Sequence, residues 1–249
     1  MTTDQMEQVK RIRTEMKRFM LMYKFALSEL ETKIEILQEE FQIIHDYSPI
    51  EHTKSRIKSP ESILKKIQRK DMNISLTNIR ENVKDIAGMR ITCSFISDIY
   101  QILDMLQNQS DITVVEIKDY IKDPKENGYQ SLHLLIKIPV FMSDRTELVP
   151  VEVQIRTIAM DFWASLEHKI FYKYDQFVPE HLLEELKEAA DSAAALDQKM
   201  ERLHNEVKAI KDENKLELEN ESMQLMIKGQ QFTIPPAFLK LLEEGEILK

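Results

Sequence analysis

The sequence predicts an α/β fold, in which a mixed β-sheet is flanked by helices, with further long helices at both ends. Strand and helix patterns alternate over residues 89–172, and apolar residues recur at helical spacing over 4–46 and 180–213. Only four of the 249 residues are Gly. Neither a G-x-G-x-x-G dinucleotide turn nor a G-x-x-x-x-G-K phosphate loop can therefore be built, and any bound nucleotide must be held by side chains.

Individual elements follow from the spacing of apolar and turn-forming residues. Strands are predicted at 89–95, 112–117, 132–140 and 149–156, and helices at 99–106 and 157–172. Ser59-Pro60 predicts a helix start, because Pro is tolerated in the first helical turn. We divide the chain into an N-terminal helical region (1–50), a catalytic domain (51–178), a long C-terminal helix (179–215) and a tail of unassigned role (216–249).

A heptad repeat of apolar residues runs over 182–210 and predicts a packing seam. Together with the apolar N-terminal helices, this seam indicates self-association, although it can also pack within one subunit. The segment 180–221 holds 13 acidic and 6 basic residues, a net of −7, so most of the chain's net negative charge lies there.

Composition excludes several classes of protein. There are 34 basic and 43 acidic residues, a net charge of −9, whereas proteins that coat nucleic acids need a positive field to displace counterions. We therefore expect no stable nucleic-acid binding. Cys93 is the single Cys, so no disulfide or Cys-based zinc site is expected and a reducing cytoplasm is favoured. No targeting segment is expected, and the apolar run 19–23 is too short for a membrane span.

The strand over 151–156 gives the strongest local signal. Alternation places Glu152, Gln154 and Arg156 on one face. Alone, this pattern is more typical of a half-exposed strand with a solvated polar face. Asp85, however, lies just before another predicted strand, and on a neighbouring strand it can share Mg²⁺ with Glu152, since Mg²⁺ takes carboxylates together with substrate phosphates. The alternative is that Asp85 is a surface turn residue paired with Arg90.

The polar loop 118–130 and the strand after it supply a second set of candidates. Gly128 permits a positive-φ turn, which would push Tyr129 outward as a flat face for stacking a base. Lys122 and Lys125 can meet phosphates as mobile charges. His133 lies in the following strand, where a single His is usually structural.

The segment 54–70 is basic, with seven Lys or Arg residues against one Glu. Ser62, Lys66 and Arg69 fall on one helical face. Such runs usually form a solvated surface. In an acidic chain, just upstream of a candidate metal site, this one also suits a triphosphate.

Five motifs in this order resemble those of the RelA/SpoT-type alarmone synthetases, in particular the small, single-function RelP-like members. They are R-I-K-S-P-E-S-I-L-K-K (56–66), D-I-A-G-M-R (85–90), P-K-E-N-G-Y-Q-S-L-H (124–133), V-E-V-Q-I-R-T (151–157) and M-D-F-W-A-S-L-E-H-K (160–169). Each motif is weak alone, but the five in order are specific, and the resemblance covers residues 25–210.

The resemblance implies a nucleotidyltransferase-like mixed sheet flanked by helices. It implies transfer of the β,γ-pyrophosphate of ATP to the ribose 3′-OH of GDP or GTP, which yields ppGpp or pppGpp and releases AMP in the stringent response. The hydrolase half of the long enzymes has no counterpart, so a synthetase alone is expected. A cytoplasmic homotetramer that uses Mg²⁺ is also implied.

The resemblance assigns roles residue by residue. On the ATP side, Arg56 and Arg90 match the pair that sandwiches adenine, and four residues match phosphate contacts: Lys58, Ser62, Lys66 and Arg69. Asp85 and Glu152 match the Mg²⁺ ligands, with Glu152 also deprotonating the 3′-OH. On the acceptor side, Tyr129 matches the Tyr that stacks on guanine. The remaining acceptor residues are Lys125, His133 and Gln154, with Asp161 at the guanine edge.

Two positions depart from the small synthetases. Gln130 replaces an Arg that many of them carry, which puts one phosphate contact in doubt, and Asp161 stands where some have Asn. Neither departure argues against the reaction or against a guanine acceptor. Two alternative functions are nevertheless considered. One is a toxic relative that pyrophosphorylates adenine nucleotides or tRNA, and the other is an inactive regulatory or RNA-binding module.

Overall fold

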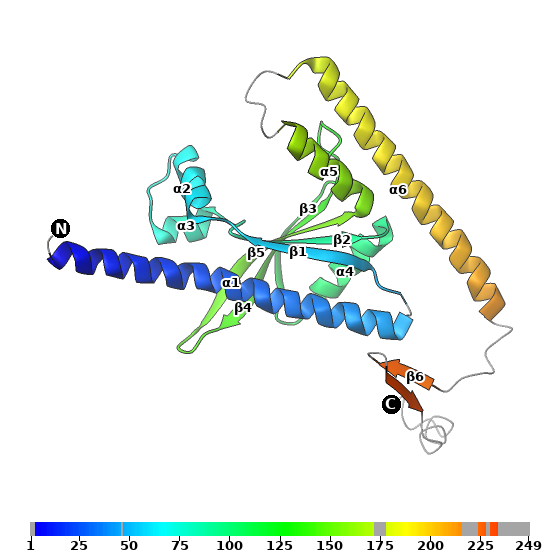
Figure 1. Cartoon of the computed structure of the whole chain (residues 1–249), viewed down its shortest axis with the longest axis horizontal. Helices are drawn as coiled ribbons and strands as arrows, with labels where there is room; N and C mark the ends of the chain where they lie inside the picture. The colour runs from blue at the N-terminus through cyan, green and yellow to red at the C-terminus, as the bar shows by residue number, and fades with distance from the viewer. Residues whose placement is uncertain (1–2, 46, 172–177, 216–223, 228–229, 234–249) are drawn as a thin grey trace.

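A five-stranded mixed sheet with strand order β1-β2-β5-β4-β3 forms the centre of the protein (Figure 1). The computed structural model describes residues 3–45, 47–171, 178–215, 224–227 and 230–233. The strands are β1 (Ile50–Ile57), β2 (Ala87–Cys93), β3 (Thr113–Asp119), β4 (Leu132–Phe141) and β5 (Thr146–Thr157). β2 and β5 run parallel, and the other neighbours pair antiparallel. The predicted α/β class with a mixed sheet flanked by helices is confirmed.

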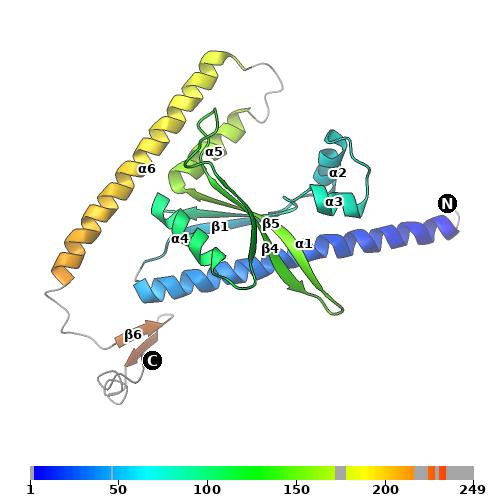
Figure 2. The ribbon, with the colours of Figure 1, turned by 180° about the vertical axis from the view of Figure 1, so that it is seen from behind.

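The apolar face of the sheet is covered by α1 (Thr3–His45) and α4 (Ile96–Gln107). Leu30 of α1, Ile99 of α4 and Val153 of β5 are fully buried there. Burying one Leu or Ile side chain contributes about 2 kcal/mol, so this layer stabilises much of the fold. α1 is one continuous helix, and its exposed N-terminal end extends past the sheet (Figures 1 and 2).

Two short helices, α2 (Pro60–Arg69) and α3 (Leu76–Asn82), connect β1 to β2. Ser59 caps α2 by accepting a hydrogen bond from the Ser62 N–H, at 3.3 Å, and Pro60 occupies the first turn. This confirms the predicted helix start. α2 buries Ile63 and Ile67, which fixes the helix against the core.

The sequence analysis missed β1 and α3. β1 is an edge strand whose inner residues are mostly polar and exposed, so it lacks the alternation by which a strand is predicted. α3 is only seven residues long and buries Ile79 alone.

The remaining long helices lie outside the sheet: α5 (Ile158–Phe171) and α6 (Glu180–Lys215). Thr157 caps α5 by accepting the Met160 N–H at 3.1 Å, and its hydroxyl also donates to the buried Asp197 of α6. The Trp163 indole N–H of α5 donates to the Leu186 carbonyl of α6 at 3.1 Å. α6 is therefore held against the end of β5 through α5 (Figure 2).

α6 also reaches α4. The Glu201 carboxylate accepts the Ser97 N–H at 2.9 Å, and the His204 ring lies 4.2 Å from that of Phe95. The predicted seam is only partly used within the chain. Leu186 and Ala193 pack toward α5, whereas five seam residues nearer the C-terminal end of α6 are exposed: Leu196, Met200, Leu203, Val207 and Ile210.

The tail contains two short antiparallel strands, β6 (Gln224–Ile227) and β7 (Gln230–Thr233). The rest of the predicted tail, including Pro235 and Pro236, lies outside the described residues. Among the described helices, none has a stretch long and apolar enough to cross a bilayer.

Replacing Gly128 should reduce stability, because Gly128 has φ +83° and an added Cβ would lie 2.5 Å from the Cβ of Ala190 on α6. A left-handed conformation costs a residue other than Gly about 1–2 kcal/mol, and the overlap adds to this. We expect Gly128→Ala to lower the free energy of unfolding by at least about 1 kcal/mol in urea titrations.

A cycle with Ala190→Gly separates the two causes. Ala190→Gly alone costs about 1 kcal/mol in helix propensity. In the double variant, Ala190→Gly should also relieve the overlap with the new Cβ. The loss of unfolding free energy in the double variant should therefore be smaller than the sum of the losses in the two single variants. Unchanged stability of Gly128→Ala would contradict the close approach of this loop to α6.

Candidate active site

The face of the sheet opposite α1 carries most of the predicted site residues in two cross-strand rows. In one row Arg56, Gly88 and Glu152 lie opposite one another on β1, β2 and β5. In the next row Arg90 pairs with Gln154, which in turn pairs with His133 on β4. The predicted alternation of β5 is confirmed, because its apolar partners on the other face are fully buried: Val151, Val153 and Ile155.

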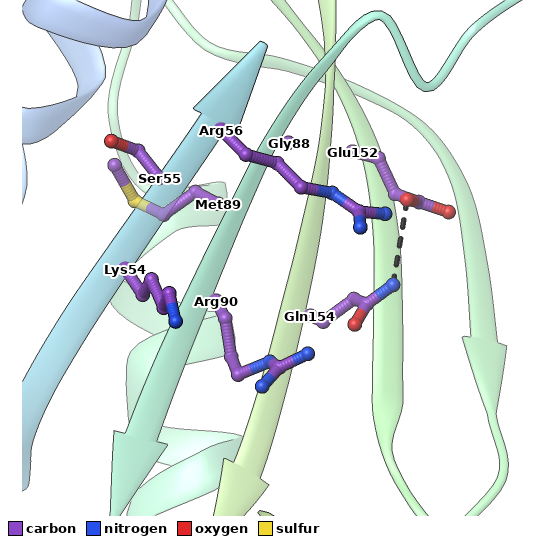
Figure 3. Close-up of a pocket in the computed structure, with 8 residues that line it drawn as sticks. All are labelled: Lys54, Ser55, Arg56, Gly88, Met89, Arg90, Glu152 and Gln154. Atoms are coloured by element: carbon purple, nitrogen blue, oxygen red, sulfur yellow. Dashed lines mark hydrogen bonds between the residues drawn. The ribbon is translucent and has the colours of Figure 1, made fainter. Parts of the chain in front are cut away.

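A first cavity of about 160 Å³, the arginine cavity, opens over β1, β2 and β5 (Figure 3). Figure 3 shows the side chains of Arg56 and Arg90 extending toward Glu152 and Gln154. The Gln154 amide donates to the Glu152 carboxylate at 3.4 Å. The cavity is lined by Lys54, Ser55, Arg56, Gly88, Met89, Arg90, Glu152 and Gln154. Two neighbouring guanidinium groups suit a flat aromatic ring, on which Arg stacks readily.

A second cavity of about 400 Å³, the lysine cavity, lies over β3, β4 and β5. Glu152 lines it as well, so this carboxylate stands between the two cavities. The lining residues are Lys66, Asn82, Lys84, Asp85, Glu116, Lys118, Tyr120, Lys125, His133, Leu134, Leu135 and Glu152. Four of them are Lys, which suits a polyphosphate ligand.

Asp85 forms two ion pairs at the edge of the lysine cavity. Its carboxylate accepts hydrogen bonds from Lys58 and from Lys66, the latter at 2.8 Å. Burial would raise the pKa of the Asp85 carboxyl, but the hydrogen bonds and charges of the two lysines outweigh it and lower the pKa. The pairing of Asp85 with Arg90 that we considered is wrong, because Arg90 pairs with Asp161 instead, at 2.9 Å.

The four predicted phosphate contacts of the basic segment have different surroundings. Lys58 and Lys66 are half-buried on Asp85. Ser62 and Arg69 lie on the exposed surface of α2, where the Ser62 hydroxyl accepts a hydrogen bond from Ser59 at 3.0 Å.

The positive φ of Gly128 is confirmed, but the outward projection of Tyr129 is wrong. Tyr129 is half-buried, with its ring centroid 6.4 Å from that of Trp163. Its hydroxyl contacts His133 Nε2 at 2.7 Å and accepts from Arg156 Nη2 at 2.6 Å. The Lys125 ammonium lies 4.8 Å from the ring centroid. These contacts hold the ring in a fixed orientation.

Arg156 is a site residue to which the sequence analysis gave no role. Strand alternation places Arg156 on the polar face of β5, yet the residue is only 5% exposed. Its guanidinium contacts three predicted acceptor residues: Tyr129 at 2.6 Å, Gln154 at 3.0 Å and Asp161 at 3.2 Å. The signal available in the sequence was an Arg at the end of a buried strand, directly before a helix.

Asp161 joins the two halves of the site. One oxygen of its carboxylate forms an ion pair with Arg90 at 2.9 Å. The same oxygen accepts a hydrogen bond from Arg156 at 3.2 Å. Asp161 lies in the first turn of α5, so the N-terminal end of this helix places the carboxylate beside the sheet.

The donor set at Asp85 and Glu152 fits Mg²⁺. Both carboxylates line the lysine cavity, and carboxylate oxygens are the ligands that Mg²⁺ prefers. Among the described residues, no group of three or more His, Cys, Asp and Glu side chains could hold a metal. Mg²⁺ bound by two carboxylates would leave ligand positions for substrate phosphates and water.

The chain is similar to known proteins over most of its length. Residues 55–177 match the model of a "region found in RelA / SpoT proteins". The chain is 52% identical over 202 residues to the GTP pyrophosphokinase YwaC of Bacillus subtilis. The aligned region covers 81% of this chain and 96% of YwaC. The chain belongs to the small alarmone synthetases of the RelA/SpoT family. It is a GTP pyrophosphokinase, as the sequence motifs predicted.

Solved structures of this family have the same fold. The small alarmone synthetase 2 of B. subtilis superimposes with a TM-score of 0.71 at 52% identity, covering 77% of this chain and 99% of that one. The small alarmone synthetase 1 of the same organism, bound to its product pppGpp, gives a TM-score of 0.71 at 40% identity, with 78% and 98% covered.

The imidazole of His133 should be neutral throughout the physiological pH range. Burial and the nearby charges of Arg156, Lys125 and Lys118 lower its pKa to about 4. The unfolded chain takes up this proton near pH 6.5, so the folded state should lose stability as the pH falls from 6.5 toward 4. An NMR titration, with the signal assigned by a His133→Gln variant, should show no protonation of His133 above about pH 5. A midpoint near 6.5 would contradict the buried, cationic surroundings.

Proposed function

We propose that this alarmone synthetase transfers the β,γ-pyrophosphate of ATP to the ribose 3′-OH of GDP or GTP, and that the transfer takes place beside the Glu152 carboxylate. The observation that carries this proposal is that Glu152 lines both cavities, so it stands where two bound nucleotides would meet. Each cavity then holds one nucleotide. Positioning and electrostatics supply most of the catalysis in such transfers.

The arginine cavity suits ATP. Arg56 and Arg90 would hold the adenine ring between their guanidinium planes. Lys58 directly follows β1 and Lys66 lies on α2, and both would exchange the Asp85 carboxylate for the phosphates of ATP. Ser62 and Arg69 lie on the same helix and would contact the outer phosphates.

The lysine cavity suits the acceptor. Tyr129 would stack on guanine, and Lys125, whose ammonium lies over the Tyr129 ring, would meet the 5′-phosphates. His133 and Gln154 line the path to Glu152 in one cross-strand row. Asp161 would accept from the guanine edge through its second oxygen. The pppGpp held by the related synthetase supports a guanosine acceptor over adenine nucleotides or tRNA.

Asp85 and Glu152 would hold Mg²⁺. When bound, the metal supplies positive charge that stabilises the negative charge developing on the phosphate oxygens. Glu152 also serves as the general base that takes the proton of the 3′-OH. The paired lysines lower the pKa of Asp85 and keep it ionised, so it could bind a cation once the lysines move to the ATP phosphates.

The cellular setting follows from the family and the surface. We propose a cytoplasmic synthetase of the stringent response, without a hydrolase activity, whose catalytic domain is residues 51–178. The exposed apolar residues of α6, such as Met200 and Val207, support self-association as a homotetramer, as does the exposed apolar surface of α1. No stable complex with nucleic acids is proposed.

The reaction is tested directly by incubating the protein with Mg²⁺, ATP labelled in the γ-phosphate, and GDP, GTP, ATP or tRNA in separate reactions. We expect label to move onto the guanosine nucleotide as AMP is released. Label on adenine nucleotide or tRNA would assign the chain to the toxic relatives instead.

Glu152→Gln should lower kcat by about 100-fold or more, because general bases contribute about 10²–10⁴-fold. The change keeps the size of the side chain and its hydrogen bond with Gln154, so thermal unfolding should be nearly unchanged. Undiminished synthesis would contradict the role of Glu152. A matched control is Glu81→Gln, an exposed residue of α3 that lines neither cavity, which should keep kcat within about threefold.

The assembly is tested by light scattering at micromolar protein concentration. We expect the mass of four chains. Replacing Met200 and Val207 by Ser should reduce this mass without unfolding the chain, because both side chains are exposed in the single chain. A monomer for the unaltered protein would contradict the proposed tetramer.

A further inference from the structure

Arg156 is the most deeply buried cation of the site, yet it touches several groups that would contact the acceptor. It is 5% exposed, whereas Arg90 is one-third exposed at its side chain. Tyr129 and Asp161, which Arg156 contacts, are half-buried and keep some exposed surface, whereas almost none of the Arg156 side chain is exposed. Its part in the site must act through its neighbours.

The guanidinium contacts its neighbours on several sides at once. One terminal nitrogen donates to the Tyr129 hydroxyl at 2.6 Å and to the Gln154 amide oxygen at 3.0 Å, and the other donates to Asp161 at 3.2 Å. Nε lies 3.4 Å from the buried Ser131 hydroxyl, which is itself tied to the Ile155 carbonyl. Ser131, directly before β4, and strand β5 thus hold the guanidinium of Arg156 in place, and this guanidinium in turn orients Tyr129.

Tyr129 receives two kinds of contact from this group. Besides the hydrogen bond to its hydroxyl, the guanidinium carbon lies 5.1 Å from the ring centroid. The hydroxyl also contacts His133 at 2.7 Å, and the ring centroid of Trp163 lies 6.4 Å from that of Tyr129. Removing the contact at the hydroxyl would leave the ring free to rotate about its side-chain bonds.

Charge balance argues that Arg156 does more than stabilise the fold. Arg156 and Arg90 share the carboxylate of Asp161, the one acidic partner within ion-pair distance of either among the described residues. Two partly buried guanidinium groups against one carboxylate leave an excess positive charge, and burying such charge costs stability. A neutral residue would serve a purely structural role at lower cost.

We propose that Arg156 is the positioning residue of the acceptor half, which holds the ring plane of Tyr129 and the carboxylate of Asp161 in the orientation that binds the acceptor base. This inference rests on the proposed stacking of guanine on Tyr129. Lys cannot replace Arg here, because a single ammonium cannot reach the Tyr129, Asp161 and Ser131 oxygens from one planar fork.

The test compares Arg156→Lys, Tyr129→Phe and the double variant by steady-state kinetics. GDP is varied at saturating ATP, and ATP at saturating GDP, with release of AMP as the readout. We expect each single variant to raise KM for GDP about tenfold, the effect of one charge-assisted hydrogen bond. KM for ATP should stay within about twofold, because Arg90 keeps its own hold on Asp161.

The double variant tests whether the two groups act together. If Arg156 acts through the Tyr129 hydroxyl, KM for GDP of the double variant should be no higher than that of the more impaired single variant. Independent effects would instead multiply and raise this KM about 100-fold. Multiplying effects, equal increases in both KM values, or an unchanged KM for GDP in folded Arg156→Lys would overturn the proposal.

Two further variants, together with Tyr129→Phe, keep the outcomes distinct. Arg145→Lys, in the exposed turn between β4 and β5, is the matched control and should change neither KM. Tyr129→Phe decides the question if Arg156→Lys does not fold, since it leaves Arg156 in place. Tyr129→Ala tests the underlying site. An unchanged KM for GDP there would overturn the stacking itself, whereas a raised KM with normal Tyr129→Phe and Arg156→Lys would overturn only the role of Arg156.

Discussion

Parallel pairing of β2 with β5 brings together groups that are distant in the sequence. It sets Gly88 opposite Glu152 and Arg90 opposite Gln154, and it carries Asp85 to the same end of the sheet. A shift of this register by one residue would turn the polar row into the core and expose Val151 and Val153. The apolar face buried under α1 and α4 therefore specifies the site on the opposite face, because only one register satisfies both.

The electrostatics of the site depend on this arrangement. Cations outnumber carboxylates around both cavities, and two carboxylates of the site are each shared by two cations. Asp85 is shared by Lys58 and Lys66, and Asp161 by Arg90 and Arg156. The free protein thus holds its basic groups in place with a small number of internal anions. Incoming phosphates are then received by cations that are already oriented, which lowers the reorganisation needed for binding.

The strands and helices that the sequence predicted correctly are those with one buried face, because burial imposes a period on the apolar residues. β5 is the clearest example, and its polar row contains Glu152. β1 was missed because an edge strand with polar residues on both faces has no such period, although it carries Arg56. The Gly128 turn was predicted from the freedom of Gly, but the position of Tyr129 was not. That position depends on Arg156 and Trp163, which local sequence does not connect to the loop.

The packing of Gly128 on Ala190 holds the loop that carries Tyr129, here called the acceptor loop, against α6, more than sixty residues later in the chain. Any side chain larger than Ala at position 190 would displace either α6 or the loop. The two positions are therefore sterically coupled: a Gly in the loop requires a small residue at the facing position of the helix. In a synthetase whose structure is unknown, this pair would signal that the helix lies against the acceptor loop, and a bulky residue at the second position would signal a different docking of the helix.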